Sequence, residues 1–224
     1  KIFDAIENME RLLADPITVI FSGSGLSIYG GLIIGGGAVL YYAHKKGLGM
    51  VHVFDACAPG LMLAYGVGRI GCQLSGDGDW GMPNNNEIPA IISFLPDWMW
   101  GFDYYGNING VDLGSPGRPV MSDGFMYEGN AWPTPFYETI MAFIIAGILW
   151  VSRKKIKVPG VILSMYLAFN GVERFFIEKI RINNNYNVFG LEATQAQIIA
   201  VAMFVFGLLG IWYFIKMEKN KVSA

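Results

Sequence analysis

Two arginines stand in or beside apolar segments, where an ionised side chain is unfavourable. Arg69 lies near the end of the apolar stretch 51–70, and Arg174 lies within the stretch 160–177. An arginine in such a setting is normally retained for a ligand or a fixed partner. Its planar guanidinium matches the oxygens of a phosphate group better than a lysine ammonium does. The pair therefore predicts a site for a phosphate-bearing anion.

Other polar residues are expected at the same depth as these arginines. Asn170, Arg174, Glu178 and Arg181 follow one another at helical spacing, which places them on one helical face. Tyr29 begins the first apolar stretch. The glycine-rich turn 76–81 follows Arg69 and could add backbone amide donors to a phosphate site, because glycine allows close approach.

Each arginine also has an ordinary explanation. Arg69 could be an interfacial arginine whose guanidinium reaches the lipid headgroups. Arg174 could form an i,i+4 ion pair with Glu178 that only ties helices together. Both arginines together, with the glycine-rich turn after the first, favour the anion site.

Cysteine, histidine and metal chemistry receive little support. Cys72 could be a nucleophile, but no histidine is expected at its depth, so a packed free thiol is favoured. His44 and His52 are expected at the opposite, cytoplasmic boundary. No His/Cys/Asp/Glu set shows ligand spacing on the outer side, so we expect no metal and no cofactor.

The composition indicates the scaffold that holds these residues. Of the 224 residues, 53% are hydrophobic and 15% are charged, and the mean hydropathy is +0.40. Soluble domains carry about 25% charged residues, so this chain is shifted toward a lipid environment. A formal net charge of -2 offers no basic face to nucleic acid. We predict an all-α polytopic integral membrane protein.

Five stretches approach the length of a membrane span, which is about 20 residues. They are 28–43, 51–70, 133–151, 160–177 and 196–215. The expected organisation is an amphipathic segment 1–27, two transmembrane helices in 28–71, a head domain 72–132, two helices in 133–178, a loop 179–193, a last helix in 194–216 and a tail 217–224.

The basic residues predict the orientation. They follow every second span boundary, as His44, Lys45 and Lys46, then Arg153, Lys154, Lys155 and Lys157, then Lys216, Lys219 and Lys221. The head loop 72–132 contains Arg118 as its only basic residue. By the positive-inside rule the basic ends are cytoplasmic, so the head loop and both arginines lie on the extracytoplasmic side and the C-terminus is cytoplasmic.

At these residues the sequence resembles the phosphatidylglycerol–prolipoprotein diacylglyceryl transferase family. The resemblance rests on the motif Gly68-Arg69-Ile70-Gly71 and on the blocks 25–33, 58–60, 80–81, 133–138, 171–181 and 195–197, taken in this order. It implies a seven-span enzyme of the bacterial inner membrane, of which this chain would carry the last five spans. Such an enzyme transfers the diacylglyceryl group of phosphatidylglycerol to the lipobox cysteine of a preprolipoprotein and releases glycerol phosphate.

The resemblance also implies roles for individual residues. Arg69 and Arg174 match the arginines that handle the phosphate, Glu178 matches their partner carboxylate, and Gly81 closes the signature. The predicted catalytic residues are Arg69, Arg174, Glu178 and Tyr29, and the predicted phosphatidylglycerol-binding residues are Arg69, Arg174, Cys72, Asp77, Gly81, Asn170 and Arg181.

This chain departs from the family pattern at three places. Many members carry asparagine where this chain has Cys72, and glutamate near Asp77, where this chain is one residue longer. Some members carry histidine where this chain has Tyr29. These departures leave the general base open.

Two other classes of function remain possible at this point. A transporter or lipid-binding protein could use the same arginines without chemistry, although transport favours ionisable residues that continue to the inner side. A structural partner in an envelope complex would explain the head domain but not the arginines. The partners expected from the first hypothesis are phosphatidylglycerol, lipobox peptides and the bilayer, and the oligomeric state is left open.

Overall fold

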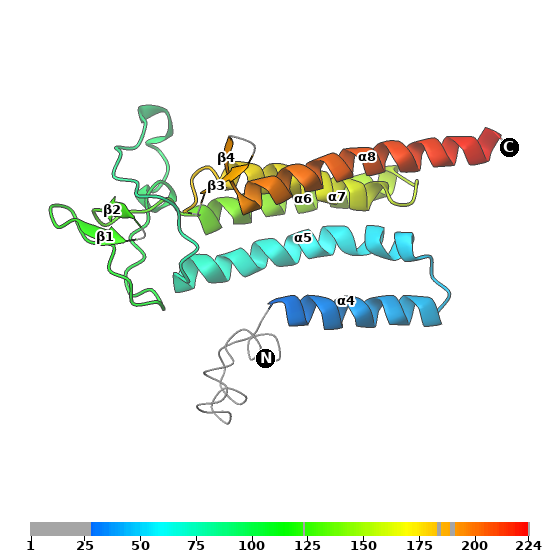
Figure 1. The fold of residues 1–224 in the computed structure, drawn as a ribbon, viewed down its shortest axis with the longest axis horizontal. Coiled ribbons are helices and arrows are strands. Elements are labelled where there is room, and N and C mark those ends of the chain that lie inside the picture. The colour runs from blue at the N-terminus through cyan, green and yellow to red at the C-terminus, as the bar shows by residue number, and fades with distance from the viewer. Residues whose placement is uncertain (1–27, 123, 183–184, 189–190, 224) are drawn as a thin grey trace, which may run out of the picture. The chain divides into compact units, whose positions relative to one another are not determined.

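The computed structural model describes the backbone of residues 28–122, 124–182, 185–188 and 191–223. This part of the chain is mainly helical (Figure 1), with the long helices α4 (Ile28–Lys45), α5 (Met50–Ser75), α6 (Thr134–Lys155), α7 (Val161–Ile177) and α8 (Gln195–Ser223). Two short 3₁₀ helices, η1 (Ala90–Ile92) and η2 (Asp97–Met99), lie in the loop after α5. The chain divides into two compact units, residues 1–53 and residues 54–224.

Two antiparallel hairpins interrupt the helices. The strands β1 (Val120–Ser122) and β2 (Phe125–Tyr127) pair in the loop between α5 and α6. The strands β3 (Asn185–Val188) and β4 (Leu191–Thr194) pair between α7 and α8. They are an addition to the all-α architecture expected from the sequence.

Each predicted membrane segment corresponds to a helix in the described part of the chain. By length and composition, α5, α6 and α8 are able to cross a membrane. The helices α4 and α7 do not meet this requirement of length and apolar composition, and α7 has only 17 residues. The prediction of a mainly helical chain with several potential membrane helices is thus confirmed at this coarser level.

The helix α5 continues through Pro59, which lies in its interior. Proline removes one backbone N–H, but membrane helices tolerate it when neighbouring groups satisfy the freed carbonyl. Close by, the Asp55 carboxylate accepts hydrogen bonds from the backbone N–H groups of Gly160 at 2.6 Å and Leu163 at 2.8 Å. Asp55 therefore caps the N-terminus of α7 from a different helix.

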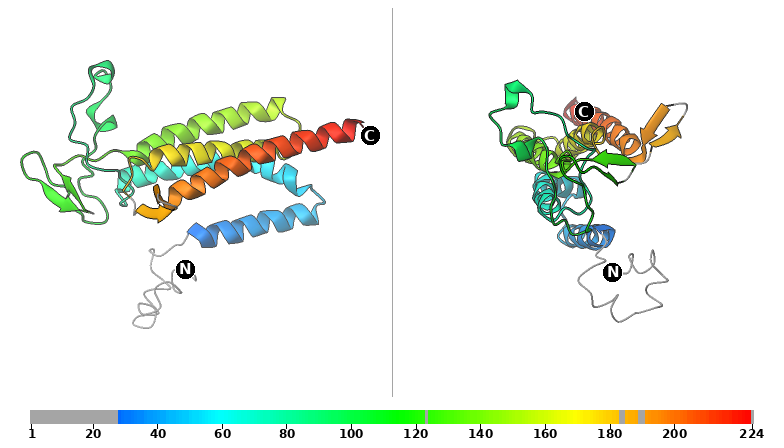
Figure 2. Two further views of the ribbon diagram at one scale, coloured as in Figure 1. Left: turned by 45° about the horizontal axis from the view of Figure 1, so that its top comes forward. Right: turned by 90° about the vertical axis from the view of Figure 1, so that its left-hand side faces the viewer.

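The core of the unit 54–224 lies between α5, α6 and α7. Its buried residues are Ala58 and Met62 from α5, Ala142, Ile145, Ala146 and Leu149 from α6, and Ile162 from α7. The helix α8 lies along α7 in both views of Figure 2. Small residues at these contacts let the helix backbones approach closely, as is usual between membrane helices. This packing brings the C-terminal ends of α5 and α7 to the N-terminal end of α6.

The loop between α5 and α6 has a core of its own, made of Trp80, Tyr104, Leu113, Tyr127 and Ala131. The Trp80 and Tyr104 rings lie 5.2 Å apart. The Tyr104 hydroxyl donates to Gln73 Oε1 of α5 at 3.0 Å. Burial raises the pKa of the Tyr104 phenol, which favours the protonated hydroxyl that donates this hydrogen bond. The loop is thereby attached to the helix that carries Arg69.

Candidate functional site

Arg69 lies on the last turns of α5 and contacts two carboxylates from other segments. Its guanidinium pairs with Asp79, from the turn after α5, and with Glu138, from the first turns of α6. The Arg69 side chain is only 12% exposed. Its guanidinium also lies 5.3 Å from the centre of the Tyr65 ring, one helical turn earlier. Arg69 is thus a largely enclosed arginine that is held by two carboxylates.

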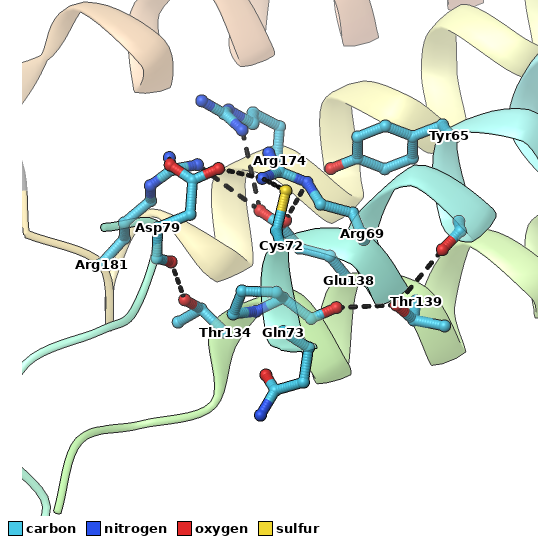
Figure 3. Close-up of polar contacts among 12 residues, drawn as sticks. Tyr65, Arg69, Cys72, Gln73, Asp79, Thr134, Glu138, Thr139, Arg174 and Arg181 are labelled. Carbon is cyan, nitrogen blue, oxygen red and sulfur yellow. Dashed lines mark hydrogen bonds and ion pairs between the residues drawn. The ribbon is translucent and has the colours of Figure 1, made fainter. Parts of the chain in front are cut away.

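Glu138 is the centre of the site (Figure 3). Its carboxylate contacts Arg69, and its Oε1 lies 3.7 Å from the NH1 atoms of both Arg174 and Arg181. The side chain is 1% exposed. A buried carboxylate requires a cationic partner, and here three guanidinium groups surround it. Sequence reasoning quoted Glu138 within the block 133–138 but did not select it as a site residue.

Asp79 joins Arg69 to Arg181. One carboxylate oxygen of Asp79 contacts Arg69 NH1, and the other contacts Arg181 NH2. The Thr134 hydroxyl donates to the Asp79 backbone carbonyl at 2.5 Å, which ties this turn to the start of α6. The sequence indicated the acidic, glycine-rich turn but singled out Asp77, two residues earlier.

Arg174 is the least enclosed of the three arginines. Its NH1 lies 3.7 Å from Glu138 and its Nε lies 4.0 Å from Glu178, and the side chain is 29% exposed. Both separations exceed ordinary hydrogen-bond distances. Among the described residues, no side-chain hydrogen bond of Arg174 is formed, so its donor fork is available to a ligand. The predicted Arg174–Glu178 pair is present, but only as a loose contact.

Gly81 holds the turn against the segment that follows α7. It forms a backbone bridge with Arg181, and its N–H donates to the Trp132 carbonyl at 2.9 Å. A Cβ atom at this position would lie 2.4 Å from the Ile180 carbonyl oxygen, so only glycine fits. The Gly81 amide is therefore engaged within the protein, and the residue acts on the site by placing Arg181.

Arg69, Arg174 and Arg181, with Asp79 and Glu138, form what is called the arginine cluster from here on. The other predicted residues lie at varying distances from this cluster. Asn170 Nδ2 lies 3.7 Å from the Met62 sulfur and, among the described residues, forms no hydrogen bond with the cluster. Asp77 is exposed and accepts from the Asp79 N–H at 3.4 Å. Tyr29 lies in α4, within the unit 1–53, and the structure describes its backbone but not its side chain.

Cys72 faces the cluster directly. Arg69 NH1 lies 3.7 Å from its sulfur. The ligand atoms of Cys72, Asp77 and Asp79 lie within 4.8 Å of one another, a grouping that sequence spacing did not reveal. Asp79 already pairs with two guanidinium groups, and their positive charge opposes a cation at the same carboxylate. The arrangement around Cys72 therefore suits an anion better than a metal ion.

Glu173 is a further buried carboxylate near the cluster. Glu173 is 2% exposed, and its Oε1 accepts a hydrogen bond from the Tyr65 hydroxyl at 3.3 Å. Neither residue was selected from the sequence. Their apolar neighbours on each helix hide the pairing, because it depends on how α5 packs against α7.

A family model described as prolipoprotein diacylglyceryl transferase matches residues 8–213. The chain is 31% identical over 166 residues to the phosphatidylglycerol–prolipoprotein diacylglyceryl transferase of Leptospira interrogans, covering 73% of this chain and 44% of that protein. It is 30% identical over 209 residues to the protein of that name from Aeromonas hydrophila, covering 92% of this chain and 64% of that protein.

A third relative, the protein of that name from Clostridium tetani, is 29% identical over 212 residues, covering 93% of this chain and 74% of that protein. The chain thus spans less than half of the Leptospira protein and about three quarters of the Clostridium protein. The resemblance drawn from the sequence motifs is confirmed by a match over most of the chain. The chain belongs to the prolipoprotein diacylglyceryl transferase family.

Proposed function

We propose that this chain carries the reaction site of an enzyme that transfers the diacylglyceryl group of phosphatidylglycerol to the lipobox cysteine of a preprolipoprotein. Glycerol phosphate is the released product. The observation that carries the proposal is the convergence of three guanidinium groups on Glu138, in a chain whose relatives are named for this transfer.

The phosphate of the donor lipid would bind first to Arg174. This guanidinium is 29% exposed, against 12% for Arg69 and 13% for Arg181, and both of its ion pairs are long, at 3.7 Å to Glu138 and 4.0 Å to Glu178. A bidentate contact between arginine and phosphate combines charge with two parallel hydrogen bonds. Arg69 and Arg181 reach the same phosphate once it competes with Asp79 for their donor groups.

In the transfer step the substrate thiol sulfur attacks the glyceryl carbon that bears the phosphate. A C–S bond forms, the C–O bond to the phosphate breaks, and its electron pair leaves with the glycerol phosphate. Negative charge grows on the departing oxygen, and fixed guanidinium groups in a site of low water content stabilise it. The thiol must lose its proton for this attack, and positive charge nearby favours the thiolate.

The proton acceptor would be Glu178 or Tyr29. Glu178 is buried at the end of α7, one turn from Arg174. Tyr29 begins α4, and its side chain lies outside the described residues. Cys72 would line the phosphate site as a neutral thiol that accepts from Arg69.

The proposed setting is the bacterial cytoplasmic membrane, with five spans in this chain and seven in the whole protein. The loop 72–132 and the loop 179–193 would face the extracytoplasmic side, and the C-terminus would be cytoplasmic. The basic residues at alternate span boundaries support this orientation. The arginine cluster would then lie at the outer membrane interface, where lipid headgroups and exported lipobox peptides both have access.

The full-length protein, purified with a native N-terminus, tests the proposal when it is incubated with phosphatidylglycerol and a lipobox peptide. Mass spectrometry should detect a peptide heavier by one diacylglyceryl group, together with an equal amount of glycerol phosphate. Phosphatidylcholine offered in place of phosphatidylglycerol provides the control for headgroup choice. Peptide that stays unmodified with a folded preparation would overturn the proposal.

A further inference from the structure

An apolar groove runs between α7 and α8, outside the arginine cluster. Its volume is about 220 Å³, and every residue that lines it is apolar: Gly171, Val172, Phe175, Phe176, Val201 and Phe204, over Ala200. Ligand pockets for whole small molecules span about 300–1,000 Å³. The groove is therefore sized for a segment of a slender apolar chain and not for a compact ligand.

The groove exists because α7 and α8 meet at small residues. A Cβ atom at Gly171 would lie 2.5 Å from the Ala200 carbonyl oxygen and 2.8 Å from the Phe204 nitrogen. The backbones are in contact there, and neither Gly171 nor Ala200 has a side chain that could fill the space between the larger neighbours. The aromatic rings of Phe175 and Phe204 then form its walls.

A positive charge lies at the end of the groove that is nearer the arginine cluster along α7. Lys179 follows the last turn of α7, and its Nζ lies 5.2 Å from the Phe175 ring centre and 5.9 Å from the Phe176 ring centre. Lys179 is exposed, and within the described part of the chain it forms no ion pair. Its ammonium is therefore held over the aromatic wall by cation–π attraction while remaining available to an anion.

The combination of a fully apolar groove with one cation at its end matches one kind of molecule. A phospholipid presents an acyl chain and, at one end of it, a negatively charged phosphate. We propose that this groove binds an acyl chain of an anionic phospholipid, with the lipid phosphate on Lys179. α8 is apolar enough to cross a membrane, so an acyl chain is the ligand that this surface meets at high concentration.

This lipid site is separate from the arginine cluster. Within the part of the chain that the structure describes, the groove side chains form no hydrogen bond or ion pair with Arg69, Arg174 or Arg181, and the Lys179 ammonium lies over the Phe175 and Phe176 rings. The inference depends on the membrane setting and not on the transfer reaction. A bound lipid here would be held one helix face away from Arg174, next to the proposed reaction site.

Native mass spectrometry of the full-length protein, released from nanodiscs of equal parts phosphatidylglycerol and phosphatidylcholine, tests the proposal. The variant Lys179→Gln should lower the preference for the anionic lipid by about fivefold, because one lysine near a membrane surface contributes about 1 kcal/mol. The variant Val201→Trp should reduce the retention of both lipids, because its indole fills the groove. Two matched controls should change neither value. The first is Lys216→Gln, because Lys216 lies over Trp212 near the other end of α8. The second is Ile199→Trp, because Ile199 is exposed and lies outside the groove.

A second measurement does not depend on the strength of retention. Phosphatidylglycerol with a photoreactive group in the middle of its acyl chain should label peptides that contain Val172 or Val201, and Val201→Trp should abolish the label. Labelling elsewhere only, or a cross-link from this face to another protein segment, would overturn the proposal. If free glycerol phosphate displaces the label as effectively as added lipid does, the site binds phosphate alone. That result would also contradict the proposal. Transfer activity measured in parallel tells a failure of this lipid site from a failure of the proposed reaction.

Discussion

Asp79 contacts the guanidinium of Arg181, which lies 102 residues later in the chain. The same carboxylate contacts Arg69 with its other oxygen. An internal anion therefore occupies the space between two arginines that the proposed reaction requires for a phosphate. The turn of Asp79, the end of α5 and the end of α7 form one connected site through this single side chain.

Asp79→Asn should strengthen the binding of a free phosphate ligand. The substitution removes the carboxylate charge that competes for Arg69 and Arg181, and a hydrogen bond to a charged group contributes about 1.5–3 kcal/mol. We expect the dissociation constant of glycerol phosphate, measured by isothermal titration calorimetry, to fall by about tenfold. Asp97→Asn is the matched control, because Asp97 lies in η2, is exposed and forms no ion pair among the described residues. Equal affinity in both variants would contradict the role of Asp79 as a competing anion.

Arg174→Lys should abolish most of the transfer activity while leaving the fold intact. Lysine keeps the positive charge but loses the planar fork, and the loss of one preorganised donor typically lowers the rate by about 10²–10³. The ion pairs of Arg174 are long, so the melting temperature should change little. Arg118→Lys, at an exposed loop position, should retain activity. Near-normal turnover by the Arg174 variant would remove the basis for a phosphate site at α7.

Glu138→Gln should destabilise the protein strongly. The substitution leaves three guanidinium groups around a neutral amide, and breaking a buried ion pair by removing one partner costs about 3–5 kcal/mol. Thermal unfolding in detergent should show a large fall in melting temperature, which the exposed control Glu128→Gln should not. A melting temperature equal to that of the control would mean that the three arginines do not need Glu138 to stay together.

Gly81→Ala should displace Arg181 without altering any charge. The added methyl group would meet the Ile180 carbonyl oxygen, and overpacking of this kind costs about 1–3 kcal/mol. We expect reduced transfer and a lower melting temperature. Gly147→Ala on α6, where a Cβ meets no atom within 4 Å, should leave both quantities unchanged. A fully active Gly81 variant would show that the bridge to Arg181 is dispensable.

Asp55→Ala should affect stability but not the reaction. Asp55 caps the N-terminus of α7, whereas Arg174 and Glu178 lie at its other end. The loss of a cap costs about 0.5–2 kcal/mol. The variant should unfold at a lower temperature and yet transfer at the normal rate per folded molecule. A selective loss of turnover with an unchanged melting temperature would be the opposite result.

The sequence by itself was sufficient for the helices and for part of the site. The stretch predicted at 133–151 corresponds to α6, Thr134–Lys155, because a long apolar run with basic residues at one end has few alternatives to a membrane helix. Helical spacing likewise indicated that Arg174 and Glu178 lie at the same end of α7, whereas Arg181, predicted on the same helical face, lies beyond the end of the helix at Ile177 and bridges Gly81. These are local properties, and local properties can be read from the order of residues.

Only the tertiary structure decided which charges meet. Asp79 lies in the glycine-rich turn 76–81 and Glu138 in the block 133–138, but the sequence did not indicate that these two acidic residues pair with the arginines. They become the partners of Arg69 and Arg181 because α5, α6 and α7 pack closely and Gly81 brings the turn against the end of α7. The energy of an ion pair depends on distance and burial, and both are set by packing between segments far apart in the chain.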